Sequence, residues 1–244
     1  MKLIVQIPCY NEAETLPLVL NSIPRRIPGI DEVRLLIIDD GSRDNTIEVA
    51  RQHGVDYIIR HPENKGLARA FRTGLDACLR LGADIVVNTD GDNQYPQADI
   101  PRLVAPILQG EADIAIGDRQ TWSIAEFSPF KRFLQAWGSR VVRNVSGTSV
   151  TDAVSGFRAY SRDAALRLVT LTSYSHTVDN VIQAGKLGLC TINVPVETNP
   201  ETRPSRLKKG NWDFVKKQAA TILRLYTLYE PLRSFFYLSL PFTL

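Results

Sequence analysis

Two carboxylates separated by one glycine form the most chemically suggestive segment of the sequence. The segment is Asn88-Thr89-Asp90-Gly91-Asp92-Asn93-Gln94, and it lies at the end of an apolar run rich in β-branched residues. Carboxylates two residues apart at the end of a strand can approach one hard divalent cation and leave its other positions open to phosphate oxygens. A cation held in this way would neutralise a diphosphate leaving group.

Two other interpretations of this segment have to be weighed. A calcium loop of the EF-hand type fits poorly, because the further acidic ligands and the terminal glutamate are missing. A phosphatase with an aspartyl nucleophile is often built on an Asp-x-Asp segment at a strand end, and it is the main rival. The neighbouring motifs therefore have to decide between metal-assisted transfer and phosphate hydrolysis.

Two further polar clusters also follow expected strands. One covers residues 8–12 and the other residues 39–46. Acidic side chains in such positions could accept hydrogen bonds from a base N–H or from ribose hydroxyls, as an acidic residue does in dinucleotide-binding folds. For Asp44 and Asn45 we favour a simpler role, the capping of a helix that begins near Thr46.

The elements that position these clusters are indicated by hydrophobic periodicity. Short apolar runs predict strands at residues 3–7, 33–38, 57–59, 85–88, 114–116 and 190–196, and apolar residues at helical spacing predict helices at 12–23, 46–53, 66–81 and 99–109. Beyond residue 117 we expect helices at 127–146, 178–187 and 212–229 and a loop and strand at 152–160. This alternation indicates an α/β fold with a mostly parallel sheet covered on both faces. Ligands of such sheets bind beyond the carboxyl ends of the strands, where all three polar clusters fall.

The overall composition is that of an ordinary folded protein. Hydrophobic residues make up 44% and charged residues 23% of the 244 residues, which argues against disorder and fits one large α/β unit. Cys9, Cys78 and Cys190 are far apart in the sequence, so a disulfide framework or a cysteine metal site is not expected and a reducing compartment is. Met1 and Lys2 lead directly into the first strand, which leaves no room for a signal peptide.

Positive charge is concentrated in the last part of the chain. From residue 201 onward there are eight basic and three acidic residues, among many aromatic and aliphatic ones. This combination suits an anionic membrane surface better than nucleic acid. We therefore expect a catalytic domain at 1–210, followed at 211–244 by a basic amphipathic helix and an apolar tail. The tail is too short to span a bilayer and is expected to be an interfacial anchor or the first part of a longer spanning helix.

Several stretches together resemble the family 2 glycosyltransferases, especially the dolichyl-phosphate mannosyltransferase-like branch and its bacterial polyprenyl-phosphate relatives. The resemblance covers residues 3–207 and rests on PCYNEAETL, IDDGSRDNT, NKGLARAFRTGL, NTDGDNQYP, IAIGDRQ, DAVSGFRAY and SRL, in this order. It implies a GT-A nucleotide-diphospho-sugar transferase fold, a nucleoside diphosphate sugar donor, Mg²⁺ or Mn²⁺ as cofactor, and inverting transfer.

The resemblance also implies a set of site residues. The metal ligands are Asp90, Asp92 and Gln94. The residues that bind the nucleotide sugar are Pro8, Tyr10, Glu12, Asp39, Asp40, Lys65, Asp90, Arg119 and Arg206. The catalytic residues are Asp92, Arg158 in the acceptor-side segment SGFR, and Asp179, which occupies the region where many relatives carry a catalytic acid.

The expected acceptor is a polyprenyl phosphate at the cytosolic face of the membrane. The family resemblance, the basic aromatic tail and the absence of a Q-x-x-R-W motif all favour it. The alternative is a sugar hydroxyl of a glycolipid or polysaccharide, which would need Asp179 as a base. An aspartyl phosphatase or a non-catalytic nucleotide-binding module is less favoured, and the lack of G-x-G-x-x-G after a strand disfavours a Rossmann dehydrogenase. UDP and GDP are both compatible with the sequence.

Overall fold

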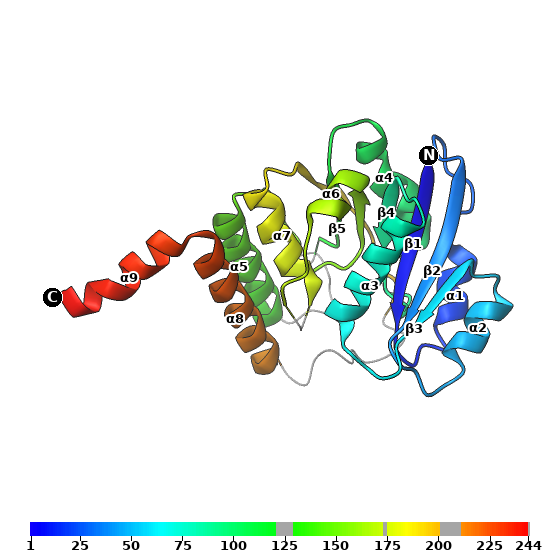
Figure 1. The fold of residues 1–244 in the computed structure, drawn as a ribbon, viewed down its shortest axis with the longest axis horizontal. Helices are drawn as coiled ribbons and strands as arrows, with labels where there is room; N and C mark the ends of the chain where they lie inside the picture. The colour runs from blue at the N-terminus through cyan, green and yellow to red at the C-terminus, as the bar shows by residue number, and fades with distance from the viewer. Residues whose placement is uncertain (121–128, 173–174, 201–210, 244) are drawn as a thin grey trace.

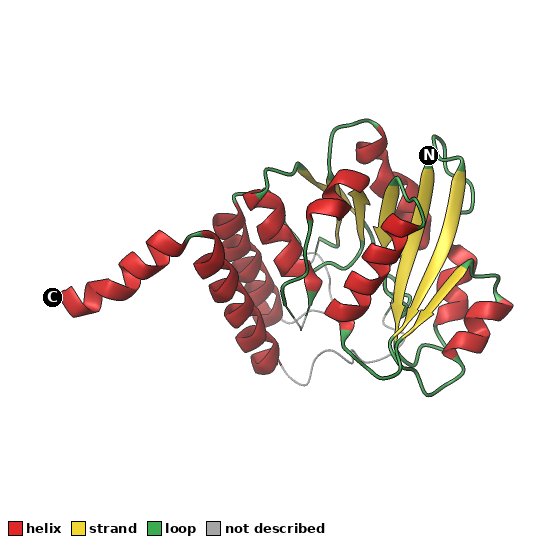
Figure 2. Cartoon of the chain, viewed as in Figure 1, coloured by secondary structure: helices red, strands yellow, loops and turns green. Residues whose placement is uncertain are grey.

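The structure is a computed structural model that describes residues 1–120, 129–172, 175–200 and 211–243. Within these residues seven strands form one sheet with helices on both faces (Figures 1 and 2). The strands are β1 (Lys2–Cys9), β2 (Glu32–Asp39), β3 (Tyr57–Arg60), β4 (Ile85–Asn88), β5 (Ile114–Asp118), β6 (Arg158–Ser161) and β7 (Thr191–Pro195). Their order across the sheet is β3-β2-β1-β4-β6-β5-β7.

Among the described strands, β6 runs antiparallel to both of its neighbours. It lies between β4 and β5, whereas β1, β2, β3 and β4 are parallel to one another and β5 is parallel to β7. The prediction of a mostly parallel sheet is therefore confirmed. The reversal of β6 means that the chain enters this strand from the edge at which β4 and β5 end.

The helices occupy nearly all the predicted places. They are α1 (Leu16–Ser22), α2 (Thr46–Gln52), α3 (Leu67–Arg80), α4 (Ile100–Leu108), α5 (Pro129–Ser146), α6 (Arg162–Arg167), α7 (His176–Lys186), α8 (Asn211–Tyr229) and α9 (Pro231–Thr243), with a 3₁₀ turn η1 at Gln97–Asp99. Of these, α9 was expected only as part of an apolar tail, and α6 was not predicted. Helix α6 has only six residues, and its first turn is capped by Ser161, whose hydroxyl oxygen accepts the N–H of Ala164.

The helix predicted from residue 12 begins four residues later, at Leu16. The N–H of Glu12 donates to Thr46 Oγ1 at 2.9 Å, and the Glu12 carbonyl accepts N–H groups from Thr15 and Leu16. These contacts make residues 12–15 a turn that is tied to α2, and Pro17 then stands in the first turn of α1, where its missing N–H is harmless. The polar cluster after β1 is consequently part of a loop.

Left-handed glycines follow the ends of two helices. Gly54 follows α2 with φ of 66°, and Gly82 follows α3 with φ of 78°. In both cases the N–H of the next residue reaches back to a carbonyl five residues earlier, as Val55 does to Ala50 and Ala83 to Cys78. At the start of α2, Asp44 Oδ1 accepts the N–H of Thr46 at 3.1 Å, which fits the capping role expected for this residue.

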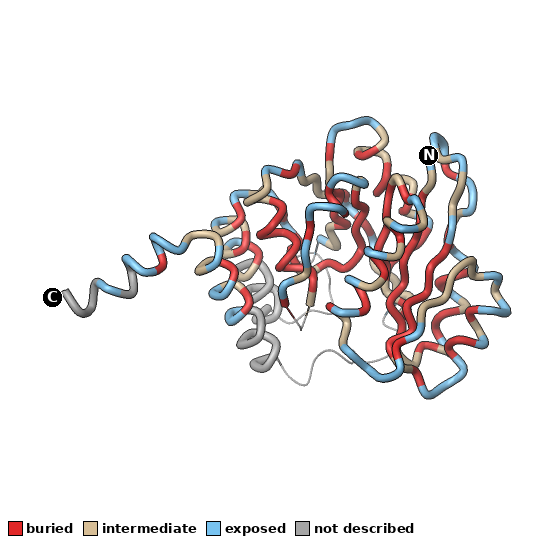
Figure 3. Tube along the Cα trace, viewed as in Figure 1, coloured by how far each residue is buried: buried red, intermediate tan, exposed pale blue. Residues whose placement is uncertain are grey.

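Alternate residues of the central strands form two hydrophobic cores. Leu3, Val5 and Ile7 of β1 face the side covered by α1, α2 and α4, whereas Ile4 faces the side covered by α3, α6 and α7. Figure 3 shows that buried residues are concentrated in the strands and in the inner sides of these helices. Burial on both faces is the reason why these strands read as nearly continuous apolar runs in the sequence.

The two C-terminal helices differ in how they contact the rest of the chain. Helix α8 packs on α5 and α7, buries Leu225 completely and is joined to α7 by a 2.6 Å ion pair between Lys186 and Glu230. Helix α9 extends away from the body (Figure 1) and exposes Leu232, Phe235 and Phe236. Among the described residues, none of the helices combines the length and the hydropathy that crossing a membrane requires.

A fully buried histidine makes the protein sensitive to acid. His176 stacks on Phe71 with ring centroids 3.7 Å apart, and neither of its ring nitrogens has a hydrogen-bond partner among the described residues. Burial, assisted by the positive charge of Arg158, lowers the pKa of His176 well below 6.5. Above pH 6.5 the ring is neutral in both states, but below it the unfolded chain takes up a proton that the folded protein does not.

We therefore expect the unfolding free energy to fall by about 1.4 kcal/mol per pH unit through this residue between pH 6 and 5. Denaturant unfolding of wild type and His176→Phe over this range measures the effect as a difference in slope. Leu18→Phe, a change at an exposed aliphatic residue, is the control and should leave the slope unchanged because it removes no titratable group. Equal slopes for wild type and His176→Phe would contradict the expectation.

Candidate active site

Three polar loops meet at the carboxyl ends of β1, β2 and β4. The loop after β1 is bonded to the loop after β2, since Asn11 N–H donates to Ser42 Oγ at 2.8 Å and Arg43 N–H donates to Asn11 Oδ1 at 2.8 Å. It is also bonded to the loop after β4, because Thr15 Oγ1 donates to the Gly91 carbonyl at 2.7 Å. The structure thus brings together the three clusters that the sequence placed at strand ends.

The loop after β4 holds two half-buried carboxylates in a tight turn. Asp92 Oδ1 accepts the N–H of Gln94 at 3.1 Å, and Asn93 adopts a left-handed conformation with φ of 60°. Asn199, beyond β7, fastens the same loop by donating its N–H to the Gln94 carbonyl and its amide group to the Asn93 carbonyl, both at 2.9 Å. Contacts from a segment more than a hundred residues away therefore fix the turn.

The side-chain oxygens of this loop could provide some, but not all, of the ligands of a divalent cation. Asp90, Asp92 and the side-chain amide of Gln94 offer oxygen ligands of the kind that Mg²⁺ and Mn²⁺ take. No group of three or more histidine, cysteine, aspartate or glutamate side chains that could hold a metal occurs among the described residues. A cation here would need further oxygens from a ligand. Gly156 leaves room for the site, since a Cβ at this residue would lie 3.0 Å from Asp90 Oδ2.

Glu12, a predicted nucleotide-binding residue, lies in the wall of this region. Its side chain is buried and its Oε2 accepts a hydrogen bond from Thr15 Oγ1 at 3.0 Å. A Cβ on Gly91 would be 3.2 Å from Glu12 Cγ, so the turn after β4 packs directly against this carboxylic side chain. Pro8 is buried at the end of β1, and Tyr10 is half-buried just beyond it.

A buried ion pair stands beside the carboxylates. Arg119, just after β5, donates from Nε to Asp152 Oδ2 at 2.7 Å and from Nη2 to Asp152 Oδ1 at 3.0 Å, and both side chains are almost fully buried. Burial lowers the pKa of Arg119, but the Asp152 charge outweighs it and the pKa lies above its usual value. Burial likewise raises the pKa of Asp152, yet the arginine brings it below its usual range. Both groups are therefore charged, and the Asp90 carboxylate is close enough to interact with the arginine.

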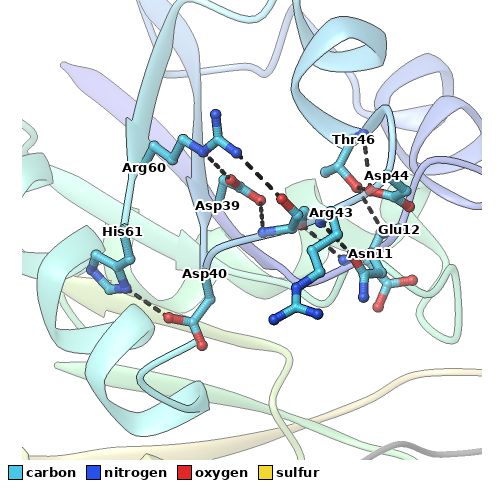
Figure 4. Close-up of polar contacts among 10 residues, drawn as sticks. Asn11, Glu12, Asp39, Asp40, Arg43, Asp44, Thr46, Arg60 and His61 are labelled. Carbon is cyan, nitrogen blue, oxygen red and sulfur yellow. Dashed lines mark hydrogen bonds and ion pairs between the residues drawn. The ribbon is translucent and has the colours of Figure 1, made fainter. Parts of the chain in front are cut away.

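The two aspartates after β2 have different surroundings (Figure 4). Asp39 is fully buried; its Oδ1 accepts the N–H of Ser42 at 3.1 Å, and its Oδ2 lies 3.3 Å from Nε of the exposed Arg60. Asp40 is engaged by the loop that leads into α3. Its Oδ1 accepts the N–H of Lys65 and contacts His61 Nδ1, and its Oδ2 accepts the N–H of Gly66.

The carboxylate of Asp40 thus holds a loop in place. The other ring nitrogen of His61 lies 3.0 Å from Thr73 Oγ1 in α3, which extends the same network into the helix. The exposed side chain of Lys65 is carried by this loop. Asp40 therefore positions Lys65 by binding the backbone N–H of Lys65. The sequence resemblance had implied the same nucleotide-binding role for Asp39 and Asp40.

We expect Asp40→Asn to raise the KM for the sugar donor about 10-fold, with a smaller change in kcat, because the amide cannot accept all the N–H groups of the loop. Steady-state kinetics at varied donor concentration measures this, and proteolysis within residues 61–66 should become faster. Asp76→Asn, an exposed change on the same helix, should alter neither. Unchanged donor KM and unchanged cleavage in Asp40→Asn would show that the loop does not depend on this carboxylate.

Two residues predicted as catalytic lie behind the loops. Arg158 is completely buried and donates to three backbone carbonyls. Asp179 is also completely buried; it accepts N–H groups from Leu171 and Thr172 and an amide hydrogen bond from Gln183. Burial raises the pKa of Asp179 above its usual value, although these hydrogen bonds oppose the shift. The catalytic role of both residues stays a prediction, and Arg206 lies outside the described residues.

Several residues of the site were not found from the sequence. Asn88 and Tyr95 bond to the backbone of Gly156, Asp152 bonds to Arg119, and Asn199 bonds to the loop after β4. Asp152 lies in the stretch DAVSGFRAY, and an acid near an expected phosphate-binding arginine could have been suspected as its partner. Asn88 and Tyr95 lie in the stretch NTDGDNQYP, but their contact with Gly156, like that of Asn199 with the loop after β4, joins segments that are distant in the sequence and could not be predicted.

The sheet order, the reversed β6 and the polar loops beyond β1, β2 and β4 define a nucleotide-diphospho-sugar transferase of the GT-A fold. The model of glycosyl transferase family 2 matches residues 4–168. The chain belongs to this family and is a glycosyltransferase.

The similar proteins agree with this assignment. An undecaprenyl-phosphate mannosyltransferase of Micrococcus luteus is 30% identical over 207 residues, which cover 80% of this chain and 83% of that protein. A UDP-N-acetylglucosamine–dolichyl-phosphate N-acetylglucosaminyltransferase of Methanococcus voltae is 30% identical over 214 residues, or 79% and 83%. Glucosyl-3-phosphoglycerate synthase of Mycobacterium tuberculosis, crystallised with Mn²⁺, UDP and glucosyl-3-phosphoglycerate, matches with a TM-score of 0.64 and 24% identity over 93% of this chain and 79% of that one. The last likeness shows the shared fold.

Proposed function

We propose that this glycosyltransferase moves a sugar from a UDP- or GDP-sugar to a polyprenyl phosphate, with inversion at the anomeric carbon. Two relatives that match about four fifths of the chain are named for undecaprenyl phosphate and dolichyl phosphate. The proposal of a diphosphate donor rests on Asp90, which lies close enough to interact with the buried cation Arg119, and on Asp92 in the same turn as Asp90. Carboxylates suit a metal ion and an arginine suits phosphate oxygens, so together they suit a metal-bound diphosphate.

The carboxylates of Asp90 and Asp92 and the amide oxygen of Gln94 would hold Mg²⁺ or Mn²⁺. When bound, the ion supplies positive charge that stabilises the departing diphosphate. Because this loop offers only two carboxylates, phosphate oxygens of the donor would complete the ligand set. Mn²⁺ and UDP in the Mycobacterium tuberculosis structure support this assignment.

The remaining donor contacts come from the loops after β1 and β2. Asp39 would accept a hydrogen bond from the base or the ribose, with Pro8 and Tyr10 beside it, since Cys9 and Asp39 are paired in the sheet. Arg119 is held rigid by Asp152, so its guanidinium would meet a phosphate without further loss of freedom. Lys65 would add a charge from the loop that Asp40 supports.

A lipid phosphate is a nucleophile that needs no base from the protein. Its second pKa is about 6, so it arrives ionised at neutral pH. The contacts of Asp179 support such an acceptor, because its carboxylate is occupied by N–H groups of the chain. Transfer to a sugar hydroxyl would instead require a base, and Asp179 is the residue that the sequence offers for it.

We further propose that the protein works at the cytosolic face of a membrane through residues 211–244. The exposed Leu232, Phe235 and Phe236 of α9 support contact with lipid, and the excess of basic residues from 201 onward supports contact with anionic headgroups. A lipid acceptor could then remain in the bilayer while its phosphate enters the site.

The proposal is tested in two steps with purified protein. A thermal-shift panel of UDP- and GDP-sugars with Mn²⁺ identifies the donor, since a ligand at 100 times its Kd adds about 2.7 kcal/mol of stability. The identified donor is then supplied with either a polyprenyl phosphate or a neutral sugar acceptor in the same detergent. Transfer to the polyprenyl phosphate is expected. Transfer only to the neutral acceptor, lost in Asp179→Asn, would establish the hydroxyl-transfer reaction instead.

A further inference from the structure

Gly156 is held against the carboxylate of Asp90 by contacts on both sides of its peptide group. Its N–H donates to Tyr95 Oη at 3.0 Å, and its carbonyl accepts the side-chain amide of Asn88 at 2.8 Å. A Cβ at Gly156 would lie 3.0 Å from Asp90 Oδ2 and 3.3 Å from Oδ1. There is thus no room for a side chain at Gly156 beside the carboxylate that is proposed to bind the metal.

The segment that leads to Gly156 is fixed by a buried arginine. Arg158 donates from Nε to the Ser155 carbonyl, from Nη2 to the Ala153 carbonyl and from Nη1 to the Thr177 carbonyl, each at 2.8 Å. The first two contacts shape the segment 153–156, and the third ties it to the first turn of α7. Burying an arginine costs free energy, and hydrogen bonds to carbonyl groups offset less of that cost than an ion pair with a carboxylate would. A buried arginine paired only with carbonyl groups is therefore best explained by its fixing the backbone geometry of the segments it joins.

A second chain of amides supports the other side of the same contact. Asn88 at the end of β4 donates to the Gly156 carbonyl and accepts from Gln6 Nε2 of β1 at 3.0 Å. All three residues are buried in the centre of the sheet. The position of Gly156 is thus fixed by hydrogen bonds to the two central parallel strands, β1 and β4, which also carry loops of the proposed donor site.

From these contacts we infer that Arg158, Asn88 and Tyr95 are positioning residues, which hold Gly156 against Asp90 and thereby set the orientation of a metal-binding carboxylate. The inference rests on the proposed metal-dependent function. It gives Arg158 a role different from the catalytic role that the sequence resemblance implied. It also means that the same contacts fix the positions of the acceptor-side segment 153–156 and of the Asp90 carboxylate in the proposed donor site.

The test compares wild type with Tyr95→Phe, Arg158→Lys and Gly156→Ala. Isothermal titration calorimetry with Mn²⁺, in the presence of saturating UDP or GDP, measures metal affinity, and steady-state kinetics separates kcat from KM. We expect Tyr95→Phe and Arg158→Lys to weaken Mn²⁺ binding about 10-fold, and Gly156→Ala to weaken it further, because each lets Asp90 turn away. Nucleotide affinity measured without metal should be unchanged.

Tyr57→Phe is the matched control for Tyr95→Phe. Tyr57 lies at the start of β3, where it faces Lys2 and is remote from the loops of the site. This variant should bind Mn²⁺ as wild type does. A merely structural role of Tyr95 and Arg158 would lower the melting temperature and leave Mn²⁺ affinity of the folded protein unchanged.

The outcomes separate this inference from the proposed function. If wild type binds Mn²⁺ with nucleotide, and all three variants bind it equally well, the positioning role is overturned and the metal-dependent function stands. If wild type with nucleotide does not bind Mn²⁺ or Mg²⁺, both are overturned. Weaker metal binding in the two conservative variants, with unchanged nucleotide binding and an unchanged Tyr57→Phe control, supports both.

Discussion

Replacing Asp90 or Asp92 by asparagine is expected to lower kcat about 100- to 1,000-fold while the protein stays folded. Each substitution keeps the shape of the side chain and removes one of the two negative charges after β4. A hard cation depends on such charges, and loss of a group that stabilises the leaving oxygens costs about 3 to 4 kcal/mol in the transition state. Both side chains are only half-buried, so the melting temperature should change little.

Transfer assays with increasing Mn²⁺ measure this effect. The variants should need much more metal than wild type and should not regain full activity. Asp163→Asn, which changes an exposed aspartate on α6, is the matched control and should behave as wild type. Full activity of both site variants after treatment with a chelator would exclude the metal-dependent reaction. Activity that remains in Asp90→Asn would by itself exclude Asp90 as an aspartyl nucleophile.

Replacing Arg119 by methionine is expected to damage both stability and activity. The change leaves Asp152 buried without its cation, and breaking a buried pair from one side costs about 3 to 5 kcal/mol. Activity should fall as well, because the guanidinium beside Asp90 is lost. Denaturant unfolding gives the first effect, and calorimetry with the donor nucleotide gives the second.

A second substitution separates these two roles of Arg119. Adding Asp152→Asn removes the orphaned charge and should restore part of the stability, but it cannot restore donor binding. Arg167→Met is the control, because its partner Asp163 is exposed and such surface pairs contribute about 0 to 1 kcal/mol. Recovery of activity together with stability in the double variant would show that Arg119 serves the fold alone.

The strands and the positions of the polar loops could be predicted because they depend on local patterns. Apolar runs followed at once by Asp39 or Asp90 mark the carboxyl ends of buried strands, and parallel strands bring such ends to one edge. The antiparallel direction of β6 could not be predicted. Its four residues, Arg158–Ser161, carry no pattern that encodes direction, because direction depends on how the chain returns to the sheet.

The roles of individual charged side chains were harder to predict than their positions. Asp39 and Asp40 are adjacent in sequence, yet successive side chains of an extended backbone point in opposite directions, so one meets Arg60 and the other meets His61. Arg158 was expected to be a catalytic residue of the acceptor-side segment, and its guanidinium is enclosed by backbone carbonyls, of which that of Thr177 is brought near by the fold alone. The pairing of Arg119 with Asp152 likewise joins two residues that are far apart in the sequence.

The reversed direction of β6 lets the length of one segment vary without disturbing the sheet. The chain leaves the sheet at the carboxyl end of β5 and returns to it at the same edge, so the hydrogen-bonded ladder of β4, β6 and β5 closes whatever the length of the segment between them. Arg119 and Asp152 stand at the beginning and near the end of this segment, and their ion pair holds its two ends together. Residues between these two positions could therefore be exchanged in a fold of this topology while the proposed donor-binding residues, Arg119 included, stay in place.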